Sequence, residues 1–428
     1  MVEGPTIPIF YTHVLITEAL AVRSFAIKRS SPEAPFQSVY EMKPHVICGL
    51  TIFAISQWMV FDAVASEIAG SPDGVQHVTV FQEDGRFAGW PANNGIWKWG
   101  NEILVGFVLA NHEERQGHTY DAASSHYMYA RSLDGGLTWG IEDAAKAGQT
   151  GWTYQNQIRD KAVAVSRLTS AIDFNHPDFA ITFSREDNNV GPSLFYYSYS
   201  RGLRWNGPYR LPNLGTPGVA ARTDYLIKDK NELVAFFTIA KTNQREGRVA
   251  MFRTRDGGVN WELRSWLGDE PEGFDIMPSS VRLSETEIIT TIRGRDVNPR
   301  RDYIKAVYSG NRGDSWAAMG EPVFDTGAGG SPPALVKLAD GRLALGYAYR
   351  SKYGSRICLR LSSDQGKTWS HEIPLRTGDG ATNDVGYPRM VQREDGKLLI
   401  AYYWNHAGAK GIKPYRYIAA TIADPLQW

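Results

Sequence analysis

The chain has 428 residues, of which 12% are aromatic and 42 are glycine, and its 46 basic and 46 acidic residues give a formal net charge of zero. Zero net charge argues against a protein that follows nucleic-acid phosphates, since such a protein needs a basic face. The length allows either two or three ordinary domains or one large domain built from repeated units.

The N-terminal part has the pattern of a leader. Residues 1–41 show no strand or helix period, and we expect them to be an unassigned extension that is not native. A basic start at Met42-Lys43, the apolar run Val46–Phe61 and the small-residue exit Ala63-Val64-Ala65 then predict a secretory signal peptide over residues 42–65, with a buried core segment as the alternative. We therefore expect a secreted or periplasmic protein, with no stable membrane insertion once the signal is removed.

Six short apolar runs follow at regular intervals and predict β-strands, because their residues are β-branched or aromatic and each run is too short for a helix. The runs are Ile103–Val108, Phe179–Phe183, Leu233–Phe237, Ile288–Ile292, Leu343–Tyr347 and Leu398–Tyr402. Four of them are preceded by a proline, in Trp90-Pro91, Met277-Pro278, Pro332-Pro333 and Tyr387-Pro388. Proline has no N–H for a central ladder, so these dipeptides indicate strand starts.

An eight-residue pattern with Ser or Thr first, Asp or Asn third in most copies, then Gly and a closing Trp occurs five times. The copies are Ser132–Trp139, Ser198–Trp205, Thr254–Trp261, Ser309–Trp316 and Ser362–Trp369. Asp or Asn can bond nearby backbone N–H groups, Gly permits a tight reversal and Trp is an apolar anchor, so each copy predicts a structural turn between two strands. The closing tryptophans are 66, 56, 55 and 53 residues apart, which indicates an array of repeated units.

We count six repeats between about Phe81 and the C-terminus. A seventh repeat remains an alternative because the first two closing tryptophans are 66 residues apart, farther than the others. The last repeat has no eight-residue pattern, as expected if its outer strand comes from the other end of the chain. The stretch His77–Phe81 could be that strand, and a ring closed in this way has no free sheet edge.

The eight-residue pattern resembles the Asp box, or BNR repeat, of the sialidase superfamily. The resemblance covers about residues 77–420 and implies an all-β fold, a six-bladed β-propeller over residues 77–428, with seven blades as the alternative. It also implies that the boxes lie on the rim of the blades, away from the active face, and that the protein is a glycoside hydrolase that removes a terminal acidic sugar from a glycan.

In sialidases three arginines hold the substrate carboxylate, a tyrosine assisted by a glutamate is the nucleophile, and an aspartate is the acid and base. Carried onto this chain, the resemblance implies carboxylate binding by Arg293 and Arg350, which end two neighbouring apolar strands, and attack by Tyr387. Its base would be Asp275 or Glu272, and Asp121 would be the acid. A carboxylate is needed because a phenol with a pKa of about 10 must lose its proton before it attacks.

The first repeat departs from the sialidase pattern. Sialidases have an arginine before the first Pro-containing strand, but Gly89 stands at that place here, and Arg86 is the nearest substitute. The segment around it, with Trp90 and Asn93, resembles propellers related to sialidases that act at uronic acids, including lyases and rhamnosidases. We expect these residues, together with Arg295 in the loop after the fourth apolar strand, to bind substrate.

A polysaccharide lyase acting at a uronic acid is therefore the first alternative. It would use an arginine to neutralise the carboxylate and His112 or His126 to take the C5 proton. His118 lies in the same loop, but His112, His118 and Asp121 are a weak signal for a metal site, and we expect neither a metal nor a cofactor.

A propeller that binds sugar without cleaving it is the second alternative. It would use exposed aromatic side chains to stack on pyranose rings, and the candidates are Trp90, Trp97, Tyr349 and Trp404. Tyr387 with a nearby acid argues against it, because binding alone needs no nucleophile. In each case the expected partner is a glycan or an acidic polysaccharide, and no nucleic acid.

Overall fold

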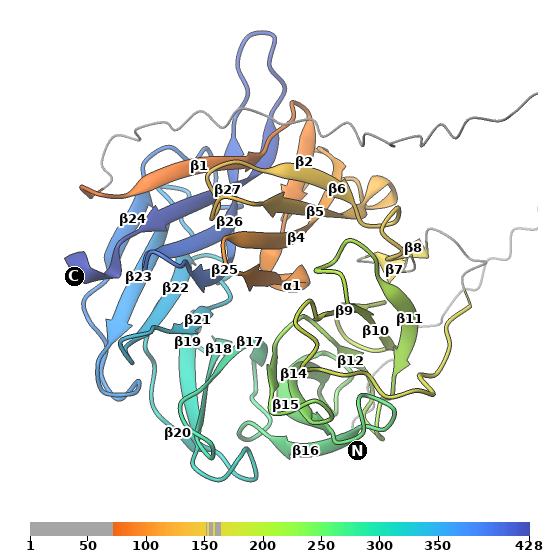
Figure 1. Ribbon diagram of the computed structural model, residues 1–428. Helices are drawn as coiled ribbons and strands as arrows, with labels where there is room; N and C mark the ends of the chain where they lie inside the picture. The colour runs from red at the N-terminus through yellow and green to blue at the C-terminus, as the bar shows by residue number, and fades with distance from the viewer. Residues whose placement is uncertain (1–71, 151, 154–156, 159–163) are drawn as a thin grey trace, which may run out of the picture. The chain divides into compact units, whose positions relative to one another are not determined.

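A computed structural model describes residues 72–150, 152–153, 157–158 and 164–428 (Figure 1). The expected extension and signal peptide lie outside these residues. The regular secondary structure of the described chain is almost entirely β-strand, with one α-helix and two 3-10 helices, each a single short turn. These are α1 (Pro91–Asn94), η1 (Ala122–Ser124) and η2 (Pro425–Gln427).

The largest sheet has nine strands in the order β25-β26-β27-β2-β4-β5-β6, with β1 on β27 and β3 on β4. Its strands are β1 (Gln76–Phe81), β2 (Arg86–Gly89), β3 (Ile96–Trp99), β4 (Glu102–Asn111), β5 (His126–Ser132), β6 (Gly140–Asp143), β25 (Gly386–Gln392), β26 (Leu398–His406) and β27 (Tyr415–Ala423). A single parallel pair, Phe87 with Arg416, joins the strands of the first repeat to those of the last.

The other sheets follow in chain order and are smaller. Their strands are β7 (Trp152–Thr153) with β8 (Gln157–Ile158); β9 (Ala180–Arg185), β10 (Ser193–Ser198) and β11 (Asn206–Leu211); β12 (Val219–Ala220), β13 (Tyr225–Ile227), β14 (Leu233–Ala240), β15 (Glu246–Thr254) and β16 (Glu262–Trp266); β17 (Phe274–Arg282), β18 (Ile288–Val297), β19 (Arg300–Ser309) and β20 (Ala317–Ala318); β21 (Ala334–Lys337), β22 (Leu343–Tyr349), β23 (Arg356–Ser362) and β24 (Ile373–Thr377). Figure 1 shows the larger sheets arranged around a common centre, with β12, β17, β21 and β25 close to it.

The predicted strands are confirmed. The six apolar runs correspond to β4, β9, β14, β18, β22 and β26, and only the first residue of one run, Phe179, precedes its strand. The predicted partner of the last repeat is also observed, since β1 pairs antiparallel with β27, for example Val78 with Ala420. β1 thereby covers the edge of β27, as expected if the outer strand of the last repeat comes from the other end of the chain.

The five boxes are turns between the two outer strands of a repeat. They connect β5 to β6, β10 to β11, β15 to β16, β19 to β20 and β23 to β24. In the first box, Asp134 Oδ1 accepts hydrogen bonds from the backbone N–H groups of Leu137 at 2.9 Å and Thr138 at 3.0 Å. Trp139, which is 3% exposed, anchors this turn in the core.

The boxes and the loops after the apolar strands lie at opposite ends of the sheet. Ser132, at the start of the first box, pairs with Ile103 near the beginning of β4. Leu109, near the end of β4, pairs with His126. The charged residues that follow the apolar strands are therefore remote from the boxes.

Asp364 provides a test of the box, because Asn311 fills the same place in another repeat. Asp364 accepts hydrogen bonds from Thr368 Oγ1 at 2.6 Å and Thr368 N at 2.9 Å, and these bonds lower its pKa to about 2. Asn311 makes the matching bonds to Ser315 with Oδ1 at 3.0 Å and Nδ2 at 2.9 Å. We expect Asp364→Ala to lower the free energy of unfolding by roughly 1 kcal/mol at pH 7, and Asp364→Asn to lower it by less.

The two Asp364 variants also have an expected pH dependence. Because the folded-state pKa of Asp364 is depressed, its charge stabilises the wild type above about pH 4, and this contribution is lost as the pH falls towards 2. Urea unfolding at pH 7 and at about pH 3 measures both effects. An equal loss for Asn and Ala at both pH values would contradict the proposed bonding.

Candidate active site

Three of the residues that precede a proline have the same unusual backbone and meet in one cluster. Trp90, Met277 and Tyr387 have φ values of 62°, 53° and 52°, in the left-handed region that non-glycine residues seldom adopt. The strand register shifts at the second and third of these positions, as in a β-bulge. All three side chains are buried in the same apolar cluster. Such strained positions persist where the surrounding structure holds them, and they concentrate at functional sites.

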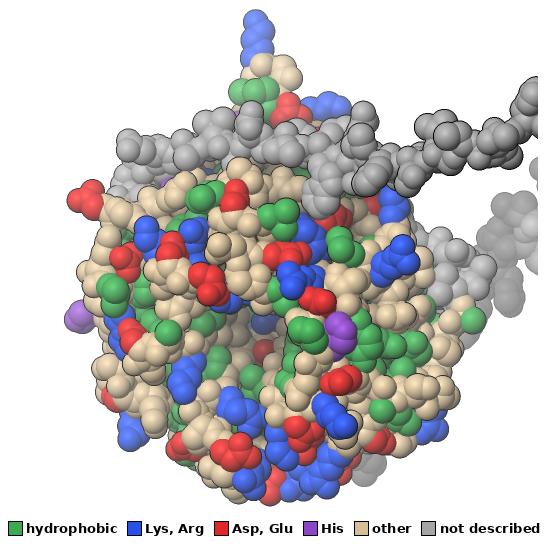
Figure 2. All heavy atoms as spheres, in the orientation of Figure 1, with side chains coloured by type: hydrophobic (Ala, Val, Ile, Leu, Met, Phe, Trp, Pro, Cys, Tyr) green, Lys and Arg blue, Asp and Glu red, His purple; other side chains and the backbone are tan. Residues whose placement is uncertain are grey.

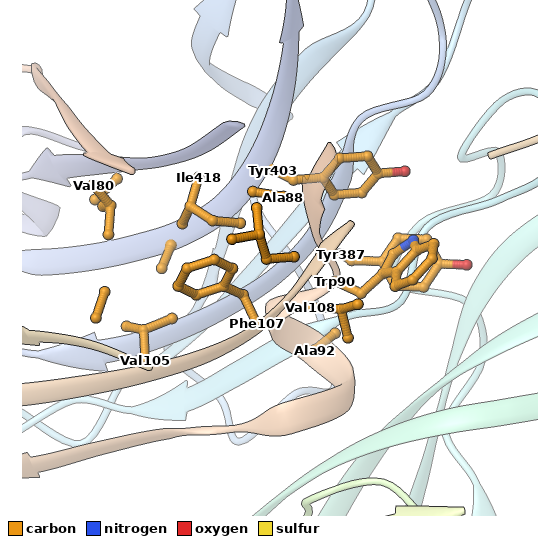
Figure 3. Packing of buried hydrophobic residues seen from close by; sticks show 14 of the residues in the cluster. Val80, Ala88, Trp90, Ala92, Val105, Phe107, Val108, Tyr387, Tyr403 and Ile418 are labelled. Carbon is orange, nitrogen blue, oxygen red and sulfur yellow. The ribbon is translucent and has the colours of Figure 1, made fainter. Parts of the chain in front are cut away.

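Tyr387 presents its hydroxyl group beyond this cluster. Figure 3 shows the hydroxyl ends of Tyr387 and Tyr403 directed the same way, away from the side chains packed around Phe107. The Tyr387 oxygen accepts a hydrogen bond from Arg293 Nη1 at 3.2 Å, and the Arg350 guanidinium lies 6.0 Å from the centre of the Tyr387 ring. The ring of His118 meets the Tyr387 ring edge-on, with the centroids 5.7 Å apart.

These neighbours change the acidity of the phenol. Burial alone would raise the pKa of Tyr387, but the positive charges of Arg293, His118 and Arg350 outweigh burial and lower that pKa to about 7. A phenol ordinarily has a pKa of about 10. Tyr387 can therefore exist as a phenolate near neutral pH, which is the form that acts as a nucleophile.

The two arginines are held in place by backbone carbonyl groups. Arg350 donates from Nε to Asn383 O at 2.7 Å and from Nη1 to Gly330 O at 3.1 Å, and Arg293 donates to Gly329 O. Gly330 has a φ of 68°, and a Cβ there would lie 2.9 Å from Asp302 Oδ1 and 3.1 Å from Arg293 Nε, so any other residue would be both strained and crowded at this position. Both arginines are buried, which orients their guanidinium groups.

Asp384 is the buried anion of the site. Its Oδ1 accepts hydrogen bonds from Tyr403 Oη at 2.6 Å and from His118 Nδ1 at 2.7 Å, and its Oδ2 accepts one from Arg416 Nε at 3.3 Å. Arg350 Nη2 lies 3.5 Å from Oδ1. Burial alone would raise the pKa of Asp384, but His118, Arg350 and Arg416 hold that pKa well below its usual range. The carboxylate is therefore ionised at neutral pH and fixes the groups around it.

The other predicted acids and bases lie elsewhere. Asp275 is buried against Lys305, which forms an ion pair with Oδ2, and burial raises the pKa of Asp275 although Lys305 opposes that effect. Glu272 is exposed, and its backbone carbonyl, not its carboxylate, accepts a bond from Lys241 at 2.9 Å. Asp121 caps η1 by accepting a bond from Ala123 N at 2.9 Å. The structure thus brings Arg293, Arg350 and Tyr387 together without any of these three carboxylates.

The predicted histidines do not share one location. His112 lies 3.6 Å from Glu114, with a pKa lowered by burial and by Arg416, while His126 begins β5 and bonds Ser124 O at 3.1 Å. Of His112, His118 and His126, only His118 contacts Tyr387. In the described part of the chain, no group of three or more His, Cys, Asp or Glu side chains could hold a metal ion.

The remaining predicted binding residues are occupied by protein contacts. Arg86 donates to Asn111 Oδ1 at 2.9 Å, Asn93 Oδ1 accepts from Arg222 Nε at 3.1 Å, and Arg295 Nε donates to Asp302 at 2.7 Å. Arg295 also lies over the Phe274 ring, at 4.5 Å from its centroid.

The prediction of exposed stacking aromatics was wrong for three of four residues. Trp90, Trp97 and Trp404 are buried, and only Tyr349 is partly exposed. The physical reason is that Trp97 and Trp404 lie within strands whose faces are covered by the next sheet, while Trp90 packs edge-on against His118 and Tyr120.

The profile of the BNR repeat-like domain matches residues 179–400, more than half of the chain. The chain belongs to the BNR repeat-like family. It is therefore a member of the sialidase superfamily of Asp-box proteins, as the five boxes predicted. The matched region includes Arg293, Arg350, Asp384 and Tyr387, whereas His118 precedes it and Arg416 follows it.

Solved structures share this fold at low sequence identity. A protein of unknown function from Dyadobacter fermentans has a TM-score of 0.60 and 18% identity over 82% of this chain and 99% of that one. The NanB sialidase of Streptococcus pneumoniae has a TM-score of 0.53 and 11% identity over 80% and 70%. The α-L-arabinofuranosidase Arb93A of Fusarium graminearum has a TM-score of 0.50 and 14% identity over 81% and 98%. A search of curated protein sequences finds no match.

Sequence reasoning about this BNR repeat-like chain missed Asp384, Tyr403 and Arg416. One signal was available for Asp384, which lies three residues before Tyr387 and therefore near the same strand start. Tyr403 and Arg416 lie inside β26 and β27, and only the pairing of Tyr403 with Ile418 and of Asn405 with Arg416 shows which side chains come together.

The surface of the BNR repeat-like unit is hollowed near the centre of the sheets, and Figure 2 shows both basic and acidic side chains there. No described helix is long and apolar enough to cross a membrane.

The acidity of Tyr387 can be measured without any substrate. We expect the ultraviolet difference between wild type and Tyr387→Phe to show one phenol ionising near pH 7, because Arg293, His118 and Arg350 outweigh burial. Replacing Arg293 with methionine is expected to move that ionisation towards pH 10, since the phenolate loses a cation. A difference spectrum that stays flat between about pH 6 and 8 would contradict the assignment.

Proposed function

We propose that the protein is a glycoside hydrolase that acts at an acidic sugar. The reaction that we propose first is the removal of a terminal acidic sugar from a glycan, as in sialidases. The observation that carries the proposal is the contact of the Tyr387 hydroxyl with Arg293, next to Arg350. A phenolate would attack the anomeric carbon, while the guanidinium groups would bind the carboxylate of the sugar. Arginine is suited to that second task because its planar N–H groups match a carboxylate.

The nucleophile in this proposal needs no carboxylate base. Asp275 pairs with Lys305 and Glu272 is exposed, so neither takes the place that the resemblance implied. The lowered pKa of Tyr387 replaces that base, because a large fraction of the phenol is ionised at neutral pH. A sugar carboxylate would be held by two arginines, Arg293 and Arg350, since Gly89 replaces the arginine of the first repeat.

The structural relatives support glycosidic bond cleavage but leave the sugar open. One is named a sialidase and another an α-L-arabinofuranosidase, and each aligns with four fifths of this chain or more. We further infer a propeller of six blades, with β25-β26-β27-β1 as the last blade, and a secreted or periplasmic location for the mature protein. The pairing of β1 with β27 supports this composition of the last blade.

Lyase chemistry at a uronic acid is the second candidate, and the position of His118 favours it. His118 lies beside Tyr387, and Tyr387 in turn contacts Arg293 and lies close to Arg350. A histidine and a phenol could therefore exchange the C5 proton of a uronate bound by these arginines. The elimination product would carry a double bond that absorbs in the ultraviolet.

The test is to incubate the purified full chain with a sialoside, a uronate glycoside, uronate-containing polysaccharides and an arabinofuranoside. Released sugar and ultraviolet absorbance are followed together. We expect an acidic sugar to be released and the neutral arabinofuranoside to remain intact. An absorbing product without hydrolysis would favour the lyase, equal release of the arabinofuranoside would refute the acidic substrate, and no product would favour a binding propeller.

A further inference from the structure

His118 occupies the centre of the site although it belongs to a loop that lies outside the matched repeats. The loop follows β4, and it places the imidazole between Asp384, whose Oδ1 is 2.7 Å from Nδ1, and the edge of the Tyr387 ring. The Trp90 ring packs on another side, with the centroids 5.0 Å apart. The His118 side chain remains 25% exposed, so a bound molecule can reach it.

The contact with Asp384 determines which imidazole nitrogen is free to exchange a proton. Asp384 is ionised, so Nδ1 carries a hydrogen and donates it to Oδ1. Tyr403 donates to the same oxygen and Arg416 to the other one, which keeps the carboxylate in place. Nε2 of His118 has no hydrogen-bond partner among the described residues, and it is the atom that remains available for proton transfer.

Among the described residues, no other neighbour of Tyr387 can serve this role. In the described part of the chain, its ionisable contacts are Arg293, Arg350, His118 and Tyr403. Arginine does not lose its proton in proteins. Burial raises the pKa of Tyr403 well above the usual value, and Asp384 adds to that effect. Asp121, the acid implied by the sialidase resemblance, is engaged in capping η1.

We propose that His118, oriented by Asp384, is the acid and base of the reaction in place of an aspartate. The inference rests on the proposed hydrolase function. In the first step Tyr387 Oη bonds to the anomeric carbon, the glycosidic C–O bond breaks, and the proton on Nε2 moves to the leaving-group oxygen. In the second step Nε2 takes a proton from water, the resulting hydroxide bonds to the anomeric carbon, and the bond to Tyr387 breaks.

Leaving-group dependence tests this role. Two glycosides of whichever acidic sugar the wild type releases are compared, one with 4-nitrophenol and one with a second sugar as the leaving group. We expect His118→Ala to lower kcat/KM for the sugar leaving group by about 10²-fold or more, because that oxygen needs a proton, and for 4-nitrophenol by less than about 10-fold. Added azide is expected to restore turnover of the nitrophenyl glycoside by His118→Ala. Azide is already an anion, so in the second step it can attack the anomeric carbon in place of water without a base.

Three further variants make the outcome decisive. His118→Gln keeps an N–H group for Asp384 and serves if the alanine variant does not fold, and exposed His371→Ala is a matched control that is expected to behave as wild type. Equal losses of kcat/KM for both leaving groups in the His118 variants would overturn the proposal. So would leaving-group dependence in Asp121→Asn. A wild type that releases no acidic sugar from any of the substrates named under the proposed function would instead refute the hydrolase function on which the proposal rests.

Discussion

Tyr387→Phe is expected to reduce glycoside hydrolysis by at least about 10³-fold, with the fold intact. The substitution removes the nucleophilic oxygen, and loss of a nucleophile removes the covalent route altogether. The phenyl ring that remains keeps its place in the apolar cluster with Trp90 and Met277. The quantity to measure is kcat/KM at the pH optimum of the wild type, together with the urea unfolding midpoint.

The matched control for this substitution is Tyr353→Phe, because the Tyr353 side chain is 88% exposed and does not belong to the buried cluster. It is expected to retain full activity. Retention of more than about a tenth of the activity in Tyr387→Phe would show that another group attacks the substrate, or that the reaction is an elimination.

Asp384→Ala is expected to lower the free energy of unfolding by about 3–5 kcal/mol. It leaves Arg350 and Arg416 buried without their carboxylate, and an uncompensated buried charge is costly. Asp395→Ala is the matched control, because Asp395 is paired with Arg393 at 3.0 Å but its side chain is 42% exposed. That pair, in which the carboxylate is exposed, is expected to contribute less than about 1 kcal/mol.

The pH dependence of the Asp384 effect has a definite sign. The folded-state pKa of Asp384 is depressed, so its contribution to stability is complete above about pH 4 and is lost as the pH falls through the folded-state pKa. The stability difference between wild type and Asp384→Ala should therefore be constant from pH 5 to 7 and shrink in stronger acid. A difference as small as that of Asp395→Ala at pH 7 would contradict the buried-anion account.

The fold was predictable because its signals are local. Each box contains within eight residues the Gly and the Trp that form the turn, with Asp or Asn at the third place in four of the five, and each apolar strand has β-branched or aromatic residues in one run. Arg293, Arg350 and Tyr387 were predictable as well, since each stands at a fixed place relative to a strand start or a strand end.

The environment of these residues was not predictable, because it depends on strand register and on packing between sheets. Asp275 lies two residues before Met277, and the bulge there shifts the register of β17 against β18, so counting residues does not show which face the carboxylate occupies. Asp384, Tyr403 and Arg416 meet only because β26 pairs with β27 and the loop before β25 packs on both.

The most direct test of the proposed reaction is to find the sugar on Tyr387. The wild type would be mixed with the acidic glycoside that it hydrolyses, quenched in acid during turnover, digested with a protease, and analysed by mass spectrometry. We predict that the peptide containing Tyr387 carries one sugar residue during turnover and none in Tyr387→Phe. An unmodified Tyr387 peptide throughout turnover, or a sugar attached to another residue, would contradict the account.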